Sequence, residues 1–203
     1  MKKILGLVVA AVLLFSFTAA YAQDAQSYLN ENKYILAEKI SKLPGFSYPS
    51  SSINPIDAQT LRSGLNLLPP ERIEQVMSGF KDAVAFFYNE NTGITEIILV
   101  LMELKDKTAA DDFIKAEEEV LKAKDTAFKT YIKSSAYDTI DIAGGEKAFI
   151  SRKVITEGEN EREVTVIVAA RNNYLIECNY LQGKHSNDQL KKDVLDIWQV
   201  MAK

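Results

Sequence analysis

Residues 94–104 read ITEIILVLMEL, and this stretch decides the fold. Successive side chains of a β-strand point to opposite faces of the sheet. Apolar residues here occupy both alternating sets: Ile94, Ile98, Val100 and Met102 form one set, and Ile97, Leu99 and Leu101 form the other. A strand of this composition needs cover on both faces. We therefore expect a sheet with helices packed on both sides.

Four further runs have the composition of strands, namely 83–88, 147–155, 162–171 and 174–181. The first is separated from 94–104 by residues 89–93, which read NENTG and are typical of a hairpin with a longer loop. The last two are separated only by Asn172 and Asn173. Asparagine tolerates positive φ, so this pair suits a two-residue hairpin turn. The runs predict an antiparallel sheet of about five strands.

Helical patterns precede, interrupt and follow these strands. The longest runs from Thr108 to Ser134, with apolar residues spaced by three or four. The last, from Ser186 to Met201, opens with the capping-box pattern Ser-Asn-Asp-Gln. Shorter helices are predicted before residue 43, from Asp57 and from Pro70, whereas residues 46–55 carry two prolines and four serines and predict a loop or linker.

These elements follow the order β-β-α-β-β-β-α after residue 80. We expect an α+β fold, an α/β/α sandwich around the antiparallel sheet. Residues 23–203 should form one globular domain, with an N-terminal helical segment and its Pro/Ser loop at 23–79 and the sandwich at 80–203. The element order is similar to that of Mog1 and PsbP-like proteins over roughly Phe80 to Met201. This resemblance implies a sandwich fold, which in such proteins serves unrelated binding and assembly functions. Because only the element order is similar, no functional residue of that family can be assigned to this sequence.

The N-terminus has the three parts of a secretory signal peptide at residues 1–22. Lys2 and Lys3 are followed by an apolar run from Ile4 to Phe17, and small residues precede an expected cleavage between Ala22 and Gln23. The apolar run is shorter than the roughly 20 residues that span a bilayer. No cysteine stands directly after it, at the expected mature N-terminus, so we expect no lipid anchor. The mature protein is therefore predicted to be soluble and exported, periplasmic or extracellular, without a membrane span.

Charge and rare residues exclude several function classes. The formal net charge of −4 argues against a nucleic-acid partner, which selects clustered Lys and Arg. His185 and Cys178 are the only histidine and the only cysteine, which argues against a zinc centre. We predict no catalytic, cofactor or metal-binding residue. The acidic run Glu117-Glu118-Glu119 is interpreted as the solvated face of a helix.

Aromatic residues at strand spacing give the one hint of binding. Phe86, Tyr88, Tyr174 and Tyr180 would either line an apolar pocket or belong to the core. We expect a non-catalytic exported module that binds a protein partner or a small apolar ligand. One alternative is a cell-envelope enzyme that uses carboxylates between Asp138 and Glu146 together with His185. A structural or assembly factor is the other alternative.

Overall fold

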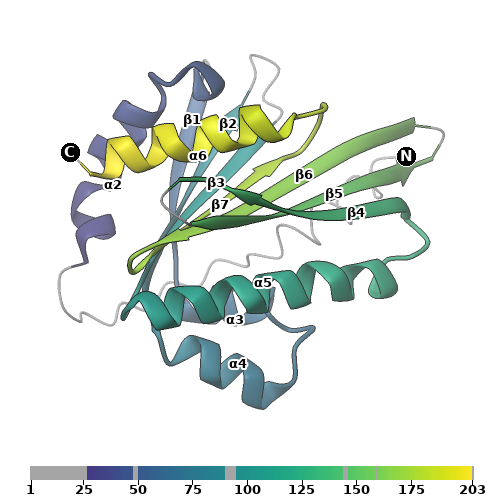
Figure 1. The fold of residues 1–203 in the computed structure, drawn as a ribbon, viewed down its shortest axis with the longest axis horizontal. Helices are drawn as coiled ribbons and strands as arrows, with labels where there is room; N and C mark the ends of the chain where they lie inside the picture. The colour runs from purple at the N-terminus through teal and green to yellow at the C-terminus, as the bar shows by residue number, and fades with distance from the viewer. Residues whose placement is uncertain (1–26, 48–49, 90–94, 144–145, 159, 203) are drawn as a thin grey trace.

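The computed structural model describes residues 27–47, 50–89, 95–143, 146–158 and 160–202. The predicted signal peptide, with Ala22 and Gln23, lies outside the described residues. The described chain forms one seven-stranded antiparallel sheet with five α-helices packed against it (Figure 1). The α+β prediction is confirmed at this level, although the sheet has two more strands than predicted.

The sheet has the strand order β1-β2-β3-β7-β6-β5-β4, and all neighbouring strands are antiparallel. The strands are β1 Ser50–Ile56, β2 Phe80–Asn89, β3 Thr95–Leu104, β4 Ile132–Asp141, β5 Lys147–Glu157, β6 Asn160–Arg171 and β7 Tyr174–Tyr180. The two strands that the sequence did not predict, β1 and β4, are the two edges.

Strand β1 corrects the prediction of a loop or linker at residues 46–55. It pairs with β2, and Pro55 lies opposite Val84. Proline cannot donate a ladder hydrogen bond, but an edge strand has one side without a partner strand and tolerates it. The N-terminal segment therefore contributes a strand to the same sheet as well as helices.

Strand β4 corrects the predicted end of the long helix. Helix α5 spans Lys107–Ala127, so it stops before Ser134. Phe128, Tyr131 and Ile132 continue the helical spacing, yet Ile132 pairs with Ile155 of β5. Tertiary pairing overrides the local pattern here. The order after residue 80 is thus β-β-α-β-β-β-β-α.

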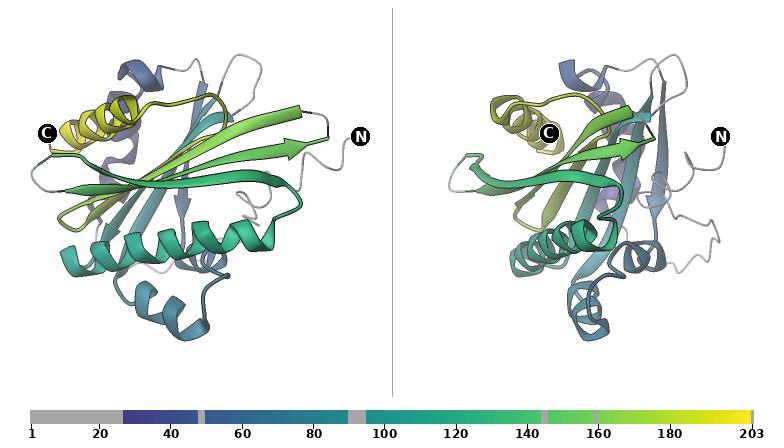
Figure 2. Two further views of the ribbon diagram at one scale, coloured as in Figure 1. Left: turned by 45° about the vertical axis from the view of Figure 1, so that its right-hand side comes forward. Right: turned by 90° about the vertical axis from the view of Figure 1, so that its right-hand side faces the viewer.

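Helices cover both faces of the sheet, as Figures 1 and 2 show from three directions. Their bounds are α2 Tyr28–Ile40, α3 Ala58–Gly64, α4 Pro70–Met77, α5 Lys107–Ala127 and α6 Asn187–Met201, with a short 3₁₀ helix η1 at Pro44–Phe46. Helices α2 and α6 pack on one face, which we call the α6 face, and α3, α4 and α5 pack on the other, the α5 face. Among the described helices, none has both the length and the apolar composition that a membrane crossing requires.

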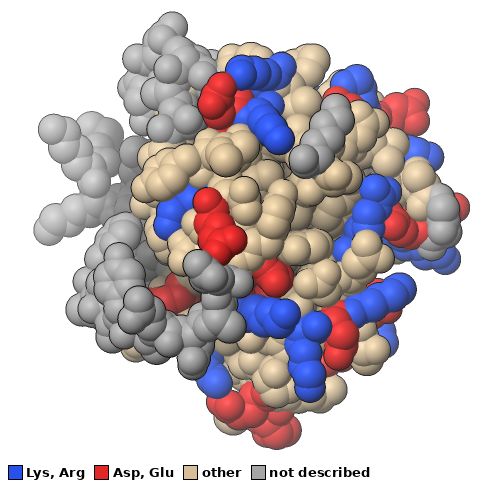
Figure 3. Space-filling view, turned by 90° about the vertical axis from the view of Figure 1, so that its left-hand side faces the viewer, with Lys and Arg blue, Asp and Glu red and all other residues tan. Residues whose placement is uncertain are grey.

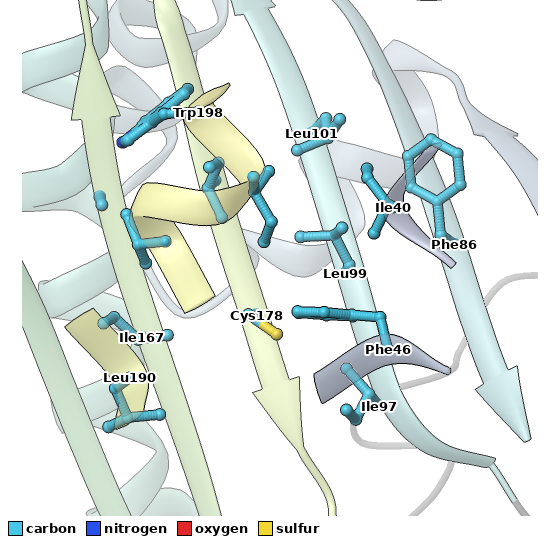
Figure 4. Packing of buried hydrophobic residues seen from close by; sticks show 14 of the residues in the cluster. Ile40, Phe46, Phe86, Ile97, Leu99, Leu101, Ile167, Cys178, Leu190 and Trp198 are labelled. Atoms are coloured by element: carbon cyan, nitrogen blue, oxygen red, sulfur yellow. The ribbon is translucent and has the colours of Figure 1, made fainter. Parts of the chain in front are cut away.

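Each face of the sheet has its own hydrophobic core. Leu99 belongs to the α6-face core and is fully buried, while its neighbour Val100 is only 8% exposed and belongs to the α5-face core. Figure 4 shows part of the α6-face core, in which Phe46 of η1 lies near Leu99 of β3 and Cys178 of β7, while Leu190 of α6 lies beside Ile167 of β6. Burial on both faces of β3 is what residues 94–104 predicted.

The structure contains two helix caps and a turn that the sequence predicted. The Ser186 hydroxyl accepts a 3.2 Å hydrogen bond from the backbone N–H of Gln189 and so caps α6. Asp57 caps α3 through a 2.7 Å bond from the Thr60 N–H. Asn172 adopts φ 55° in the β6–β7 turn. These contacts fix where the helices begin and where the sheet reverses.

Surface charges are interspersed. Figure 3 views the side of α2 and of the C-terminal end of α6, where acidic and basic side chains alternate among uncharged ones. Several exposed pairs lie one helical turn apart, such as Lys107 and Asp111 at 2.7 Å. Exposed pairs of this kind contribute little stability, about 0–1 kcal/mol each.

Candidate functional site

Strand β7 delivers polar groups to both faces of the sheet. It lies between β3 and β6, near the middle of the sheet. Cys178 and Tyr180 belong to the α6-face core, and the alternating residues Glu177 and Asn179 therefore point to the α5 face. We describe the two faces in turn.

On the α6 face, Asp193 of α6 is buried with only 4% of its surface exposed. The Tyr180 hydroxyl donates a 2.6 Å hydrogen bond to its Oδ2, and the Gln189 amide donates a 2.6 Å bond to its Oδ1. Burial raises the pKa of Asp193 above its usual value, and the two hydrogen bonds oppose that rise. A Cβ at Gly45 would lie 3.2 Å from Oδ1, so η1 packs directly on this carboxyl. Asp193 therefore joins η1, β7 and α6.

His185 lies beside this buried acid. Its ring centroid is 4.2 Å from that of Tyr180, and its Nε2 is 3.3 Å from the Gln182 carbonyl oxygen. The histidine also lies close enough to act electrostatically on Asp193. A histidine and an acid thus come together, but both oxygens of that acid already accept hydrogen bonds.

The segment from Asp138 to Glu146, which the enzyme alternative requires, divides between two places. Asp138 accepts a 2.9 Å hydrogen bond from Asn187, whose Oδ1 accepts a 2.6 Å bond from Arg152. Glu146 instead forms an ion pair with Arg171 at 2.8 Å, near Trp198. Only the Asp138 end of the segment therefore lies near His185.

Cys178 is a core residue. It is 1% exposed and lies beside Leu99 and Phe46 in Figure 4. Burial strongly raises the pKa of its thiol, which disfavours the thiolate. Because the thiolate is the nucleophilic form, this environment suits packing and does not suit covalent catalysis.

The four aromatic residues predicted as a pocket do not all come together. Phe86, Tyr88 and Tyr180 are buried in the α6-face core, and Tyr88 and Tyr180 flank Ile97 in one row across the sheet. Tyr174 lies at the other end of β7, with its ring 6.1 Å from that of Tyr28. Three of the four positions therefore fill the core, and the fourth lies apart from them.

On the α5 face, an acidic side chain lies among apolar residues. Glu117 is 8% exposed and lies on the buried side of α5, with Phe113 and Val120. Within the described ranges it makes no hydrogen bond and no ion pair within 4 Å. Burial and the nearby Glu177 raise the pKa of Glu117 to about 8, while Lys124 opposes the rise. These surroundings favour the protonated form of this side chain.

Glu177 approaches the same place from the sheet. It pairs with Val100 of β3 and Val168 of β6, which both belong to the α5-face core. The Asn179 amide donates a 2.8 Å hydrogen bond to its Oε1. Glu117 of α5 and Glu177 of β7 are therefore close enough to interact electrostatically, in a layer of apolar residues. We call Glu117, Glu177 and Asn179 the carboxyl pair site.

The sequence interpretation placed Glu117 on a solvated helix face, and this was wrong. Glu117 follows Phe113 by four residues and precedes Val120 by three, which puts it on the apolar stripe of α5. Glu177 likewise alternates with Leu175 in a strand that is buried on both faces. Both spacings were available in the sequence and could have identified the site.

A second buried charge on the α5 face is fully paired. Lys153 of β5 is 8% exposed and donates to Asp125 and to the Leu121 carbonyl oxygen, both on α5. Tyr137 of β4 also donates to Asp125. Burial lowers the pKa of Lys153, and Asp125 opposes that effect. These contacts tie the end of α5 to the sheet.

No family model and no curated protein matches the chain. Among solved structures, the extracellular domain of PknH from Mycobacterium tuberculosis is similar, with a TM-score of 0.50 and 10% sequence identity over 88% of this chain and 99% of that domain. An uncharacterized protein from Mycobacterium smegmatis matches with a TM-score of 0.35 and 10% identity over 79% of this chain and 96% of that one. The first likeness concerns the fold alone, and the second is too weak to support an argument.

Proposed function

We propose that this chain is an exported, soluble, non-catalytic module that binds a small ligand at the carboxyl pair site. The observation that carries the proposal is the carboxyl-bearing side chain of Glu117, which is 8% exposed on the buried side of α5 and close enough to Glu177 for the two groups to interact electrostatically. Buried polar groups in folded proteins are nearly always paired. A perturbed, unpaired acid in a packed layer is a physical indication of a binding site.

The remaining reactive groups support binding over catalysis. Asp193 already accepts hydrogen bonds from Tyr180 and Gln189, so it is poorly placed to take a proton from a substrate. The Cys178 thiol is buried and disfavours ionisation. Nucleophile, base and oxyanion donors would have to meet in one place for acyl or phosphoryl transfer.

Export is proposed from the N-terminal sequence, in which Lys2 and Lys3 precede the apolar run and Ala22 precedes Gln23. A chain with one cysteine cannot form an internal disulfide, so outside the cytoplasm its stability rests on packing. The two hydrophobic cores on either face of the sheet provide that packing.

A protein partner is the second candidate, and one observation favours it. Helix α2 exposes two adjacent apolar side chains on its outer surface, Tyr34 at 71% and Ile35 at 52%. An exposed apolar patch is a common feature of protein interaction sites. The pair is small, so we rank this candidate second.

Thermal melting of the purified mature chain in a compound library tests the proposal. A ligand present at 100 times its Kd stabilises the folded state by about 2.7 kcal/mol. We expect at least one compound class to raise the Tm of the wild type and to have a smaller effect on Glu117→Gln. Hits that shift both proteins equally, or a library without hits, would overturn binding at this site.

A further inference from the structure

Strand β4 is the outermost strand at one end of the sheet, as Figures 1 and 2 show. It is 10 residues long, and its burial pattern marks all but three of them as exposed. An unpaired edge of this length is a template for pairing with another strand. We propose that β4 pairs in antiparallel orientation with β4 of a second copy of this chain, about a twofold axis at Tyr137. This surface is separate from the carboxyl pair site, and the proposal does not depend on that site.

The hydrogen-bond pattern shows which backbone groups of β4 lie on its free side. The N–H of Ile142, directly after β4, donates a 2.8 Å hydrogen bond to the carbonyl oxygen of Glu146, directly before β5. In an antiparallel ladder, successive residues alternate between bonding to the partner strand and pointing away from it. The register of β4 and β5 continues without a shift back to the β-bulge at the start of β4. The N–H and C=O groups of Ser135, Tyr137 and Thr139 therefore point away from β5.

A second observation agrees with this assignment. The Thr139 N–H donates a 2.8 Å hydrogen bond to Oδ1 of Asp138, the side chain of its own neighbour. An amide that bonds to an adjacent side chain in this way has no strand beside it. The opposite edge strand, β1, contains Pro55, and proline hinders strand addition at an edge. Strand β4 contains no proline, and its β-bulge and Lys133, which also hinder addition, lie at its first end only.

The sequence of β4 favours one antiparallel register between two copies. A twofold axis at Tyr137 places Ser135 opposite Thr139 of the second copy. The same axis places Ala136 opposite Asp138. The outward-facing residues of the two copies then exchange N–H···O hydrogen bonds in pairs. An axis at Asp138 would set two carboxylates opposite each other, which is destabilising, and an axis at Ala136 would draw the β-bulge into the ladder.

The surrounding packing leaves this edge accessible and fixes the residue at the axis. Helix α5 packs mainly against β6 and β7, further inside the sheet. The Tyr137 hydroxyl donates to Asp125 of α5, and its ring stacks on that of Phe149 with centroids 5.7 Å apart. In the dimer the two Tyr137 side chains would lie side by side on the α5 face. Cross-strand aromatic pairs of this kind stabilise a ladder.

Sedimentation velocity of the purified mature chain, from about 1 to about 500 µM, tests the proposal. A ladder of this length buries less area than a standard interface, so we expect a dimer with a Kd of about 1–100 µM. Thr139→Pro should weaken the dimer about tenfold or more, because it removes an outward N–H. The fold should tolerate this proline, since the N–H that it removes makes no bond to β5. Melting curves of the variant check that it is folded.

Charge substitutions at Ala136 test the register. Ala136→Lys should tighten the dimer and Ala136→Glu should weaken it, each by about threefold or more, because position 136 lies opposite Asp138 of the second copy. Ser134 is the matched control. It lies opposite Ile140, so Ser134→Lys and Ser134→Glu should change the Kd equally. Both Ala136 variants keep the test informative if the proline variant does not fold.

Hydrogen exchange followed by NMR locates the interface. Amides of Ser135, Tyr137 and Thr139 should exchange more slowly as the protein concentration rises. The proposal is overturned if the chain stays monomeric up to about 500 µM, if folded Thr139→Pro dimerises as well as wild type, or if both Ala136 variants shift the Kd in the same direction. A dimer whose newly protected amides lie in β1 or around Tyr34 of α2 would also overturn it.

Discussion

The hydroxyl of Tyr180 donates a 2.6 Å hydrogen bond to Oδ2 of Asp193, in the buried layer between β7 and α6. This contact joins the central part of the sheet to the last helix, and Gln189 supplies the second hydrogen bond of the same carboxyl. Removal of one partner from a buried hydrogen bond leaves the other without compensation.

Replacement of Tyr180 by Phe should therefore destabilise the fold by about 1–3 kcal/mol, because Asp193 keeps only the Gln189 donor. Urea unfolding followed by circular dichroism measures the change. Tyr131→Phe is the matched control, since Tyr131 is 37% exposed and should change stability by less than about 0.5 kcal/mol. Equal effects of the two substitutions would contradict a stabilising role for the hydrogen bond.

Glu117 should make stability depend on pH in a specific direction. Its pKa in the folded state, about 8, lies above its ordinary value of 4.5, so the folded state binds more protons than the unfolded state between these values. This contribution is fully present at low pH and is lost as the pH rises to about 8, by up to about 1.4 kcal/mol per pH unit. Glu117→Gln should remove the slope and Glu118→Gln should not. If the free energies of unfolding of wild type and Glu117→Gln change with pH by the same amount from pH 5 to pH 8, the raised pKa of Glu117 is contradicted.

Aspartate at Leu99 or at Val166 should prevent folding. Leu99 is fully buried on the α6 face and Val166 is 6% exposed on the α5 face. An unpaired buried charge costs several kcal/mol against a total stability of roughly 5–15 kcal/mol. Soluble yield and circular dichroism give the readout, with Ser134→Asp on the exposed part of β4 as control. Folded, soluble Asp variants at both buried positions would contradict a sheet buried on both sides.

Lys153→Ala should cost about 3–5 kcal/mol, because it leaves Asp125 and the Leu121 carbonyl without their buried donor. Lys122→Ala removes an exposed pair with Glu118 and should cost less than about 1 kcal/mol. Chemical denaturation of both variants gives the comparison. A cost for Lys153→Ala no larger than that of the control would show that its contacts add little stability.

Gly79 allows a test of packing between two segments. A Cβ at this position would lie 2.6 Å from Cβ of Ala109, where α5 begins. Gly79→Ala should therefore cost about 1–3 kcal/mol through overpacking. Ala109→Gly should relieve the clash, so a double-mutant cycle should give a favourable coupling energy between the two substitutions. If the stability changes of the two single substitutions simply add in the double variant, the close contact between positions 79 and 109 is contradicted.

The fold could be predicted where local pattern and tertiary environment agree. The apolar alternation at Leu99 and Val100, the Asn172 turn and the Ser186 cap all act through their own or neighbouring residues. The two edge strands were missed because their stability comes from a partner strand. Pro55 and the polar start of β4 contradict strand composition, but pairing with β2 and β5 places them in the sheet.

The candidate site was harder to predict because its two halves are distant in sequence. Glu117 and Glu177 each interrupt an apolar pattern, and their spacing places Glu117 on the buried side of α5 and Glu177 on the α5 face of β7. Their proximity depends on the packing of α5 against β7, which no local pattern specifies. His185 and Asp193 are close in sequence, yet the role of Asp193 became visible only with its bond to Tyr180.

The burial of Cys178 makes this thiol a built-in reporter of unfolding. At 1% exposure in the α6-face core, it is out of reach of a bulky reagent while the sheet is intact. Modification then requires an opening that separates α2 and α6 from β7, so the labelling rate follows the population of that opened state. As the chain has no other cysteine, a single mass increment would record each opening, without any engineered probe.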